Sequence, residues 1–377
     1  PSGAFRGFGG PQGAFAAESQ INKLAEKLGL DAVEMRRRNL ISDGSIGQFN
    51  SMYPEGVTIK QVVEECAKRS NWPIAKVENL LPHNIRRGHG FACALKNIGF
   101  SFGFPEECWA EVELHGGSEI ERVVLHHAGA ECGQGAHTVF VQMVAEACGV
   151  SIDCIELDTA DSASTRNSGS ASASRMTFMA GNSIRGAVDL ALKKWRSEER
   201  PAIGEYKFVP RQTTALDPET GECDPNITYG YVAQRVIADV DIETGHVRVV
   251  DVISVNDVGK AINPIQIEGQ IEGAVVQAHG YALTENLILR GGHVETAHFS
   301  NYLLPTSLDV PERVESVILE YPDPQGAWGL RGVAEMPFLP YAPAITAAVH
   351  DATGIWFDQF PLTPERVLRG LDQAVYD

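Results

Sequence analysis

Residues 232–257, VAQRVIADVDIETGHVRVVDVISVND, decide the fold. Two runs rich in valine and isoleucine flank a turn at residues 243–246, where Gly245 can supply the positive φ that a tight turn needs. This stretch predicts a β-hairpin. A second hairpin is expected where residues 110–114 alternate between apolar and charged types and, after a glycine turn, an apolar run resumes at residues 123–125.

Helical spacing surrounds these hairpins. A helix is expected to follow the glycine-rich residues 1–13 and to end at Gly29, because apolar residues recur there at intervals of three and four. Two segments, residues 31–34 and 58–61, resemble capping boxes that open helices. Four more segments have helical spacing: residues 136–148, 180–194, 268–280 and 342–352. Helices mixed with hairpins indicate an α+β fold with mixed sheets and packed helices.

A break in this pattern spans residues 71–87 and contains Pro73 and Pro82. We place a domain boundary there, which divides the chain into residues 1–85 and residues 86–377.

Composition excludes several classes of protein. The chain has 377 residues, of which 44% are hydrophobic and 21% charged, and this argues against disorder. A net charge of −18 argues against a nucleic-acid partner, because such a partner requires a basic face that displaces counterions. No apolar run approaches the roughly 18 residues that a membrane span needs.

The seven cysteines are odd in number and include no C-x-x-C pair. This pattern argues against a disulfide framework, a structural zinc site or an iron–sulfur cluster held by this chain alone. Free thiols favour a reducing, cytoplasmic location. The chain also begins abruptly, without an initiator methionine or a signal peptide, so we interpret it as a processed or partial piece of a longer protein.

The first motif that carries chemistry is GAFRGFGGPQ at residues 3–12. Its glycines let the backbone approach a ligand closely, and Arg6 offers a planar fork of donors that suits phosphate or an oxo group. No strand precedes it and the spacing is not that of a dinucleotide fingerprint. The alternative is a glycine-rich turn with two core phenylalanines.

Four later segments resemble binding loops because they combine glycine with small or polar residues. They are ECGQG at residues 131–135; GSASASR at residues 169–175, followed by GN at residues 181–182; DVG at residues 257–259 and NP at residues 263–264, followed by GQIEGA at residues 269–274; and GVAEMPF at residues 332–338. The first and third are expected at helix N-termini, where free N–H groups favour anions. Ordinary helix starts and a flexible surface loop are the alternatives for these segments.

In this order, the five segments resemble the molybdopterin-binding large subunit of the xanthine dehydrogenase and aldehyde oxidase family. The resemblance covers nearly the whole chain but only the later part of that subunit. It implies a molybdenum-cofactor-binding domain architecture, with residues 1–85 ending the first cofactor-binding subdomain and residues 86–377 forming the second. The family's earlier motifs have no counterpart here, so they would lie on a partner polypeptide or an upstream stretch.

The resemblance also implies roles for individual residues. No residue is expected to coordinate the metal directly, although Arg6 and Ala173 would lie near molybdenum. Substrate would contact Phe8, Phe100 and Ser101, and the neighbouring phenylalanines offer competing registers for Phe100. The cofactor would be held by Phe5, Arg6, Gly7, Cys132, Gly133, Gln134, Ala173, Ser174 and Gln270.

Glu335 aligns with the family's catalytic base, and its neighbours in sequence are apolar, which would disfavour its charged form. Ala334 replaces the usual glycine, and Arg331 stands where lysine is common.

Such enzymes insert water-derived oxygen into a C–H bond of an aromatic heterocycle or aldehyde. The cofactor would be a molybdenum–pterin, with the cytosine dinucleotide form as one option. A [2Fe-2S] subunit and an FAD subunit would carry the electrons away. Carbon monoxide oxidation, reductive dehydroxylation and a non-catalytic scaffolding role remain alternatives.

Five further polar residues are interpreted as structural. His126 and His127 end a strand pattern without the spacing of a helical zinc site, and His137 is expected to pack on a helix. Asp257 and Glu272, in apolar stretches, are expected to be network or capping partners.

Overall fold

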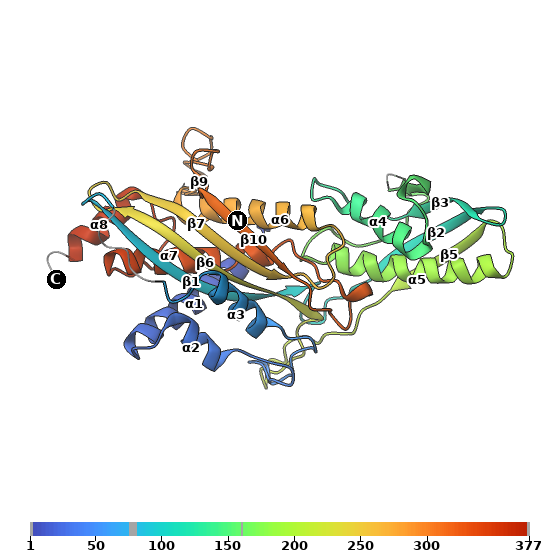
Figure 1. Cartoon of the computed structure of the whole chain (residues 1–377), viewed down its shortest axis with the longest axis horizontal. Helices are drawn as coiled ribbons and strands as arrows, with labels where there is room; N and C mark the ends of the chain where they lie inside the picture. The colour runs from blue at the N-terminus through green and yellow to red at the C-terminus, as the bar shows by residue number, and fades with distance from the viewer. Residues whose placement is uncertain (1–2, 75–80, 160, 375–377) are drawn as a thin grey trace.

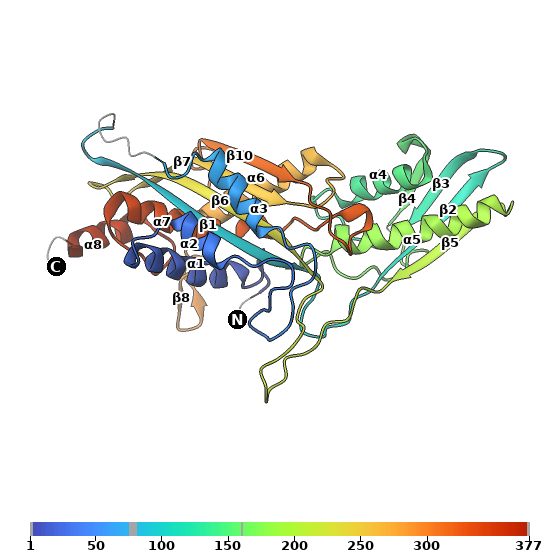
Figure 2. The same cartoon turned by 60° about the horizontal axis from the view of Figure 1, so that its bottom comes forward.

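The computed structural model describes residues 3–74, 81–159 and 161–374. Two lobes lie end to end, and each is built on a four-stranded sheet (Figures 1 and 2). The larger lobe contains the sheet β1-β6-β7-β10, and the smaller lobe contains the sheet β4-β3-β2-β5. This mixture of helices and mixed sheets confirms the α+β class.

The sheet of the larger lobe is formed by residues far apart in sequence. β1 (Ile85–Ile98) pairs antiparallel with β6 (Thr228–Asp241), and β6 pairs antiparallel with β7 (Val247–Asp257). β10 (Arg313–Leu319) joins β7 in parallel. The hairpin expected at residues 232–257 is confirmed, and Gly245 has a φ of 75° in its turn.

Helices cover both faces of this sheet. α7 (Tyr341–Thr353) lies across β1 and β6. It can approach β1 closely because Gly88 and Gly90 have no side chain; a Cβ atom at either position would overlap the backbone of α7. α3 (Ile59–Arg69) packs on the opposite face. The other helices of this lobe are α1 (Gly10–Lys27), α2 (Ala32–Asn39), α6 (Pro264–Leu283), α8 (Pro364–Ala374) and the short 3-10 helix η3 (Met336–Phe338).

The helices of the first 69 residues therefore share a core with the large sheet. Val62 and Val63 of α3 pack with Phe91 of β1 and Tyr231 of β6 in one apolar cluster. The division between residues 85 and 86 stays a prediction about the family's subdomains.

The smaller lobe is a sheet with helices on one face. β2 (Cys108–Gly116) pairs with β3 (Ile120–His126) as expected for the second hairpin. β4 (Ile155–Asp158) and β5 (Ala202–Phe208) complete the sheet. α4 (Ala136–Cys148) and α5 (Met176–Arg196) pack their apolar sides against it.

The remaining elements are short. η1 (Ile152–Cys154) precedes β4, and η2 (Ala327–Gly329) lies in the loop after β10. β8 (Leu289–Arg290) and β9 (His293–Val294) form a small hairpin that projects from the larger lobe (Figure 1). No helix among the described residues combines the length and apolarity that crossing a membrane requires.

Several helix boundaries differ from the sequence predictions. α4 spans the expected residues 136–148, whereas α6 begins at Pro264, after its capping residue Asn263. Gly269 and Gln270 therefore lie inside α6, and the expectation that they open a helix is wrong. The sequence spacing missed this start because Asn263 and Pro264 supply the cap and the first turn.

The two capping boxes behave differently. Asp31 accepts hydrogen bonds from the backbone N–H groups of Val33 and Glu34, as expected of a helix cap. Thr58 begins α3 but donates its hydroxyl to Asp257, 2.5 Å away, and makes no capping hydrogen bond. The carboxylate of Asp257, distant in sequence, thus takes the place of a backbone N–H group of α3 as the partner of Thr58.

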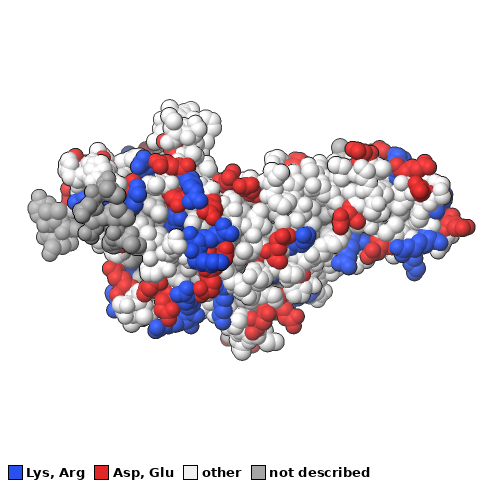
Figure 3. Space-filling model, viewed as in Figure 1, with Lys and Arg blue, Asp and Glu red and all other residues white. Residues whose placement is uncertain are grey.

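Charged side chains of both signs are interspersed over the face in Figure 3. This pattern forms no continuous basic patch on that face, in keeping with the net charge of −18.

Candidate active site

A cavity of about 890 Å³ lies between the two lobes. Its walls come from the end of β1, the N-terminal parts of α4, α5 and α6, the residues before α1, and the loop at residues 331–335. Of the residues expected to form the site, Gly7 and Gly133 do not line the cavity; those that do are Phe5, Arg6, Phe8, Phe100, Ser101, Cys132, Gln134, Ala173, Ser174, Gln270 and Glu335. Segments distant in sequence thus meet at one place.

Three helices direct their N-terminal ends at this cavity. Ala136 of α4, Met176 of α5 and Gln266 in the first turn of α6 are among its walls. Free backbone N–H groups and the helix dipole favour anionic groups at such ends. The cavity is therefore suited to a ligand that carries phosphate.

Arg6 joins two of the cavity walls. Its Nε atom donates to the carbonyl of Ala334, and its Nη2 atom donates to the backbone oxygen of Gln270 at 3.1 Å and to that residue's Oε1 at 3.2 Å. Burial lowers the pKa of Arg6 to about 10, against the opposing attraction of Glu335. The planar guanidinium therefore fixes the loop of Glu335 against α6, in addition to facing the cavity.

Glu335 is buried, and its carboxylate contacts polar groups. Oε1 accepts the backbone N–H of Gly7 at 3.0 Å, and Oε2 lies 3.1 Å from the Nζ atom of Lys96. The Ser174 hydroxyl donates to Oε2 at 3.3 Å. The apolar neighbours along the chain are therefore not the groups that contact the carboxylate.

Lys96 was not predicted from the sequence as a site residue. It lies near the end of β1, is buried, and bonds Oδ1 of Asn97 as well as Glu335. A lysine in the largely apolar run of residues 91–98 was a usable signal, since lysines are almost never fully buried unless paired.

Strained backbone gathers at the same cavity. Phe8, Phe102, Ala173 and Ser174 are cavity-lining residues other than glycine with φ values between 42° and 57°. Such conformations cost of order 1–3 kcal/mol each and persist only where the surrounding structure enforces them. Their concentration here supports a functional role for the cavity.

The ECGQG loop is organised by its glutamate. Glu131 accepts hydrogen bonds from the backbone N–H groups of Gly133, Gly135 and His137. Against burial, these bonds lower the pKa of the Glu131 carboxyl. The N–H group of Gly133 is thereby occupied, whereas the side chain of Gln134 remains at the cavity wall.

The aromatic residues proposed to contact substrate also lie here. Phe8 is 74% exposed, and the Phe100 ring packs edge-on to Phe104 with 4.9 Å between centroids. Phe102 and Phe104 line the cavity too, so the competing registers for Phe100 stay open. The Ser101 hydroxyl donates to Asn226 at 2.5 Å.

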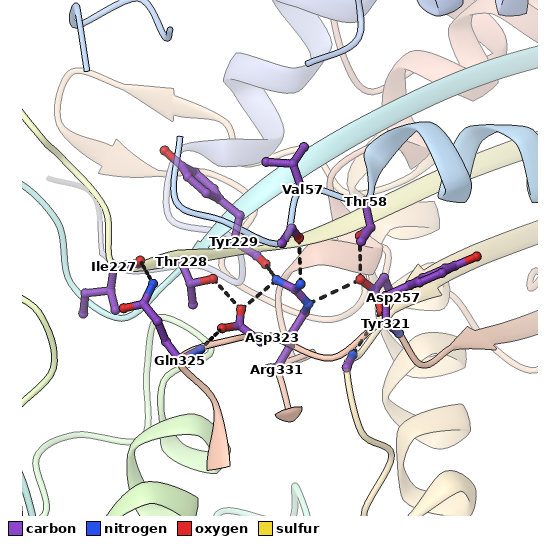
Figure 4. A network of polar contacts seen from close by, with 12 residues as sticks. Val57, Thr58, Ile227, Thr228, Tyr229, Asp257, Tyr321, Asp323, Gln325 and Arg331 are labelled. Atoms are coloured by element: carbon purple, nitrogen blue, oxygen red, sulfur yellow. Dashed lines mark hydrogen bonds and ion pairs between the residues drawn. The ribbon is translucent and has the colours of Figure 1, made fainter. Parts of the chain in front are cut away.

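A buried ion-pair network anchors the loop that carries Glu335 (Figure 4). Arg331 lies 3.3 Å from Asp257 and 2.7 Å from Asp323, and all three side chains are fully buried. It also donates to the carbonyls of Gly56 and Tyr229. Asp257 is thus a network residue, as expected.

The histidines have structural contacts. The two ring nitrogens of His126 contact Asp158 and Glu113, and this network raises the pKa of His126 against the effect of burial. His127 accepts the N–H of Gly129, and burial lowers the pKa of His127 to about 3. His137 contacts the carbonyl of Gly129 and the Phe140 ring, and Glu272 is an exposed residue of α6.

The Gln266 side chain at the cavity wall has a buried oxygen without a hydrogen-bond partner among the described residues. Oε1 of Gln266 makes no hydrogen bond, although its side chain packs against Gly135. A buried unsatisfied acceptor requires an explanation, and a bound ligand with a donor supplies one. A pterin, rich in N–H groups, together with its phosphate, fits a wall that presents amides and helix N-termini.

Comparisons with known proteins agree with this geometry. A family model described as a molybdopterin cofactor-binding domain matches residues 65–202 and 190–311, and a second model of that description matches residues 1–40. The xanthine dehydrogenase molybdenum-binding subunit of Escherichia coli O157:H7 is 30% identical over 409 residues, which cover 97% of this chain and 53% of that protein. Aldehyde oxidoreductase of Megalodesulfovibrio gigas is 29% identical, with 98% and 41% covered.

Solved structures show the same architecture. Aldehyde oxidoreductase from Desulfovibrio gigas matches with a TM-score of 0.89 at 27% identity, covering 98% of this chain and 42% of that chain. CO dehydrogenase from Oligotropha carboxidovorans matches with a TM-score of 0.82 at 20% identity, covering 98% of this chain and 52% of that chain. This likeness shows a shared fold alone. The chain spans about half the length of the curated relatives it matches.

Proposed function

The chain belongs to the family of molybdopterin cofactor-binding domains, and we propose that it supplies the catalytic base and much of the cofactor site of a molybdenum-dependent hydroxylase. The observation that carries this proposal is the position of Glu335, whose carboxylate faces a cavity beside Arg6 and Gln270. A scaffold without activity would have no need of a buried acid at that place.

Several groups would hold the cofactor. Arg6, Gln134 and Gln270 offer side-chain hydrogen bonds, and the N-termini of α4 and α5 favour its phosphate. Cys132, Ala173 and Ser174 line the same wall. When bound, the molybdenum–pterin group supplies the redox chemistry and a site for the oxygen that is inserted. The cytosine dinucleotide form remains one option.

Glu335 would act as a general base. Lys96 and the Gly7 N–H contact its carboxylate and hold it where it could take the proton of the water-derived nucleophile. A positioned base of this kind contributes about 10²–10⁴-fold to a rate. Ser174, which donates to the carboxylate and accepts from the Glu335 backbone N–H, fixes its direction.

The aromatic side chains at the cavity support a flat substrate. Phe8 and the phenylalanines of residues 100–104 present ring faces and edges, which suit an aromatic heterocycle or an aromatic aldehyde. We therefore favour hydroxylation over carbon monoxide oxidation or reductive dehydroxylation.

Further polypeptide would complete the site. Phe5 and Phe8 are 41% and 74% exposed beside the cavity, an arrangement expected of a surface that another segment covers. That segment would correspond to the part of the relatives that precedes the matched region. A [2Fe-2S] subunit and an FAD subunit would then receive the electrons, in a complex that we place in the cytoplasm.

Metal content tests this proposal. The chain would be purified alone and together with the segment that supplies the first half, and molybdenum would be measured by mass spectrometry. We expect stoichiometric metal in the complex and little in the lone chain. A complex without molybdenum would refute the cofactor assignment, and full metal in the lone chain would refute the need for a second segment.

A further inference from the structure

We propose that Lys96 is a positioning residue for Glu335: its ammonium group pairs with the carboxylate of the base and holds it at the cavity wall. This inference rests on the proposed function, because it assigns Lys96 a role in the proton transfer of Glu335. Lys96 would act through Glu335 and would not itself take up the substrate's proton.

The contacts of Lys96 leave it little freedom. Lys96 is 7% exposed, and its Nζ atom lies 3.1 Å from Oε2 of Glu335 and 2.5 Å from Oδ1 of Asn97. Asn97 is in turn held by the carbonyl of Gly99 and the hydroxyl of Ser101. The ammonium group is thus fixed by a chain of bonds from the end of β1.

Both charges of this pair depend on each other. An isolated buried ammonium or carboxylate is costly, and each partner compensates the other. Within the described part of the chain, removing Lys96 would leave the Glu335 carboxylate with the N–H of Gly7 and the hydroxyl of Ser174 as its direct partners. The neutral, protonated acid would then be favoured, and a protonated acid is no base.

The other cations near the cavity cannot replace Lys96. Arg6 attracts Glu335 over a distance, but its donors contact Ala334 and Gln270. Arg175 is paired with Glu106, and Arg331 is paired with two aspartates. Lys260, which also lines the cavity, is paired with Glu320. Among the described residues, Lys96 is therefore the cation in direct contact with the base.

The pH profile of kcat/KM tests this role in the assembled enzyme. The acid limb of this profile is the fall in kcat/KM at low pH. Lys96→Met and Lys96→Gln should move it upward by about one pH unit or more, since an opposite charge within about 4–6 Å shifts the pKa of a carboxyl by 1–3 units. Lys96→Arg, which keeps the charge, should retain a limb near that of the wild type. Lys207→Met is the matched control, because it removes a lysine paired with Glu107 outside the cavity, and its limb should not move.

Infrared difference spectra provide a readout that does not depend on turnover. The band of a protonated carboxyl that Glu335→Gln removes should appear at higher pH in Lys96→Met and Lys96→Gln than in the wild type. An acid limb and a carboxyl band that both stay unmoved, with full molybdenum content, would overturn the proposal. If Glu335→Gln itself retains turnover, the proposed function fails, and this outcome is distinct from a failure of Lys96 alone.

Discussion

Replacement of Arg331 by methionine removes the only cation from a fully buried group of three charges. Asp257 and Asp323 would then remain as two carboxylates without their ion pair (Figure 4). Breaking a buried pair in this way costs about 3–5 kcal/mol. With an unfolding entropy of about 2.1 cal/mol/K per residue over 377 residues, this loss corresponds to a fall in Tm of about 4–6 °C.

The pH dependence of this loss follows from the aspartates. Burial raises the pKa of Asp257, and Arg331 opposes that rise. Without Arg331 the rise is larger, so the folded state binds a proton more readily than the unfolded state. A raised folded-state pKa stabilises the folded protein at low pH, and this stabilisation is lost as the pH increases. The deficit of Arg331→Met should therefore shrink as the pH is lowered.

Thermal unfolding of the purified protein checks both statements. The matched control adds Asp257→Asn and Asp323→Asn to Arg331→Met, so that no charge of the group remains, and a large part of the lost stability should return. A fall in Tm below about 1 °C for Arg331→Met at neutral pH would show that the network does not anchor the loop at residues 331–335.

Three further outcomes are expected. Arg6→Lys should strongly reduce activity, because an ammonium cannot join Ala334 and Gln270 with the planar geometry of a guanidinium, and wild-type turnover would contradict this. Phe8→Ala should raise KM for a ring substrate by one or two orders of magnitude, from lost burial of roughly 1.5–3 kcal/mol and ring contact, whereas an unchanged KM would favour a small non-aromatic substrate. The folded-state pKa of His127, about 3, lies below its unfolded value of about 6.5. The stability that this difference contributes at neutral pH should therefore be lost as the pH falls from about 6.5, by up to ~5 kcal/mol near pH 3. Denaturant unfolding should show a flatter pH dependence in His127→Gln, and equal slopes would refute the assignment.

Local patterns in the sequence predicted elements whose stabilising contacts are themselves local. The hairpin at residues 232–257 and helix α4 were predictable because alternation, turn glycine and helical spacing lie within a few residues of one another. The start of α6 was predicted too late, since Asn263 and Pro264 precede the apolar spacing. Helix α8 was not predicted.

The candidate site was predictable as a set of motifs but not as a set of contacts. Glu335 and Arg6 could be singled out from their segments, whereas the pairing of Glu335 with Lys96 depends on where β1 ends relative to the loop after β10. Thr58 shows the same limit, because its sequence matches a capping box and its hydroxyl bonds Asp257 instead. Electrostatic surroundings set by tertiary contacts cannot be taken from neighbours along the chain.

Glu335→Gln tests the central claim most directly. Glutamine keeps the shape and can still accept the Gly7 N–H, but it cannot take a proton from the nucleophile. In the assembled enzyme, kcat should fall by about 10²-fold or more, while molybdenum content and the spectra of the partner clusters stay normal. A Glu335→Gln enzyme with full metal and near-normal turnover would contradict the account and remove Glu335 from the mechanism.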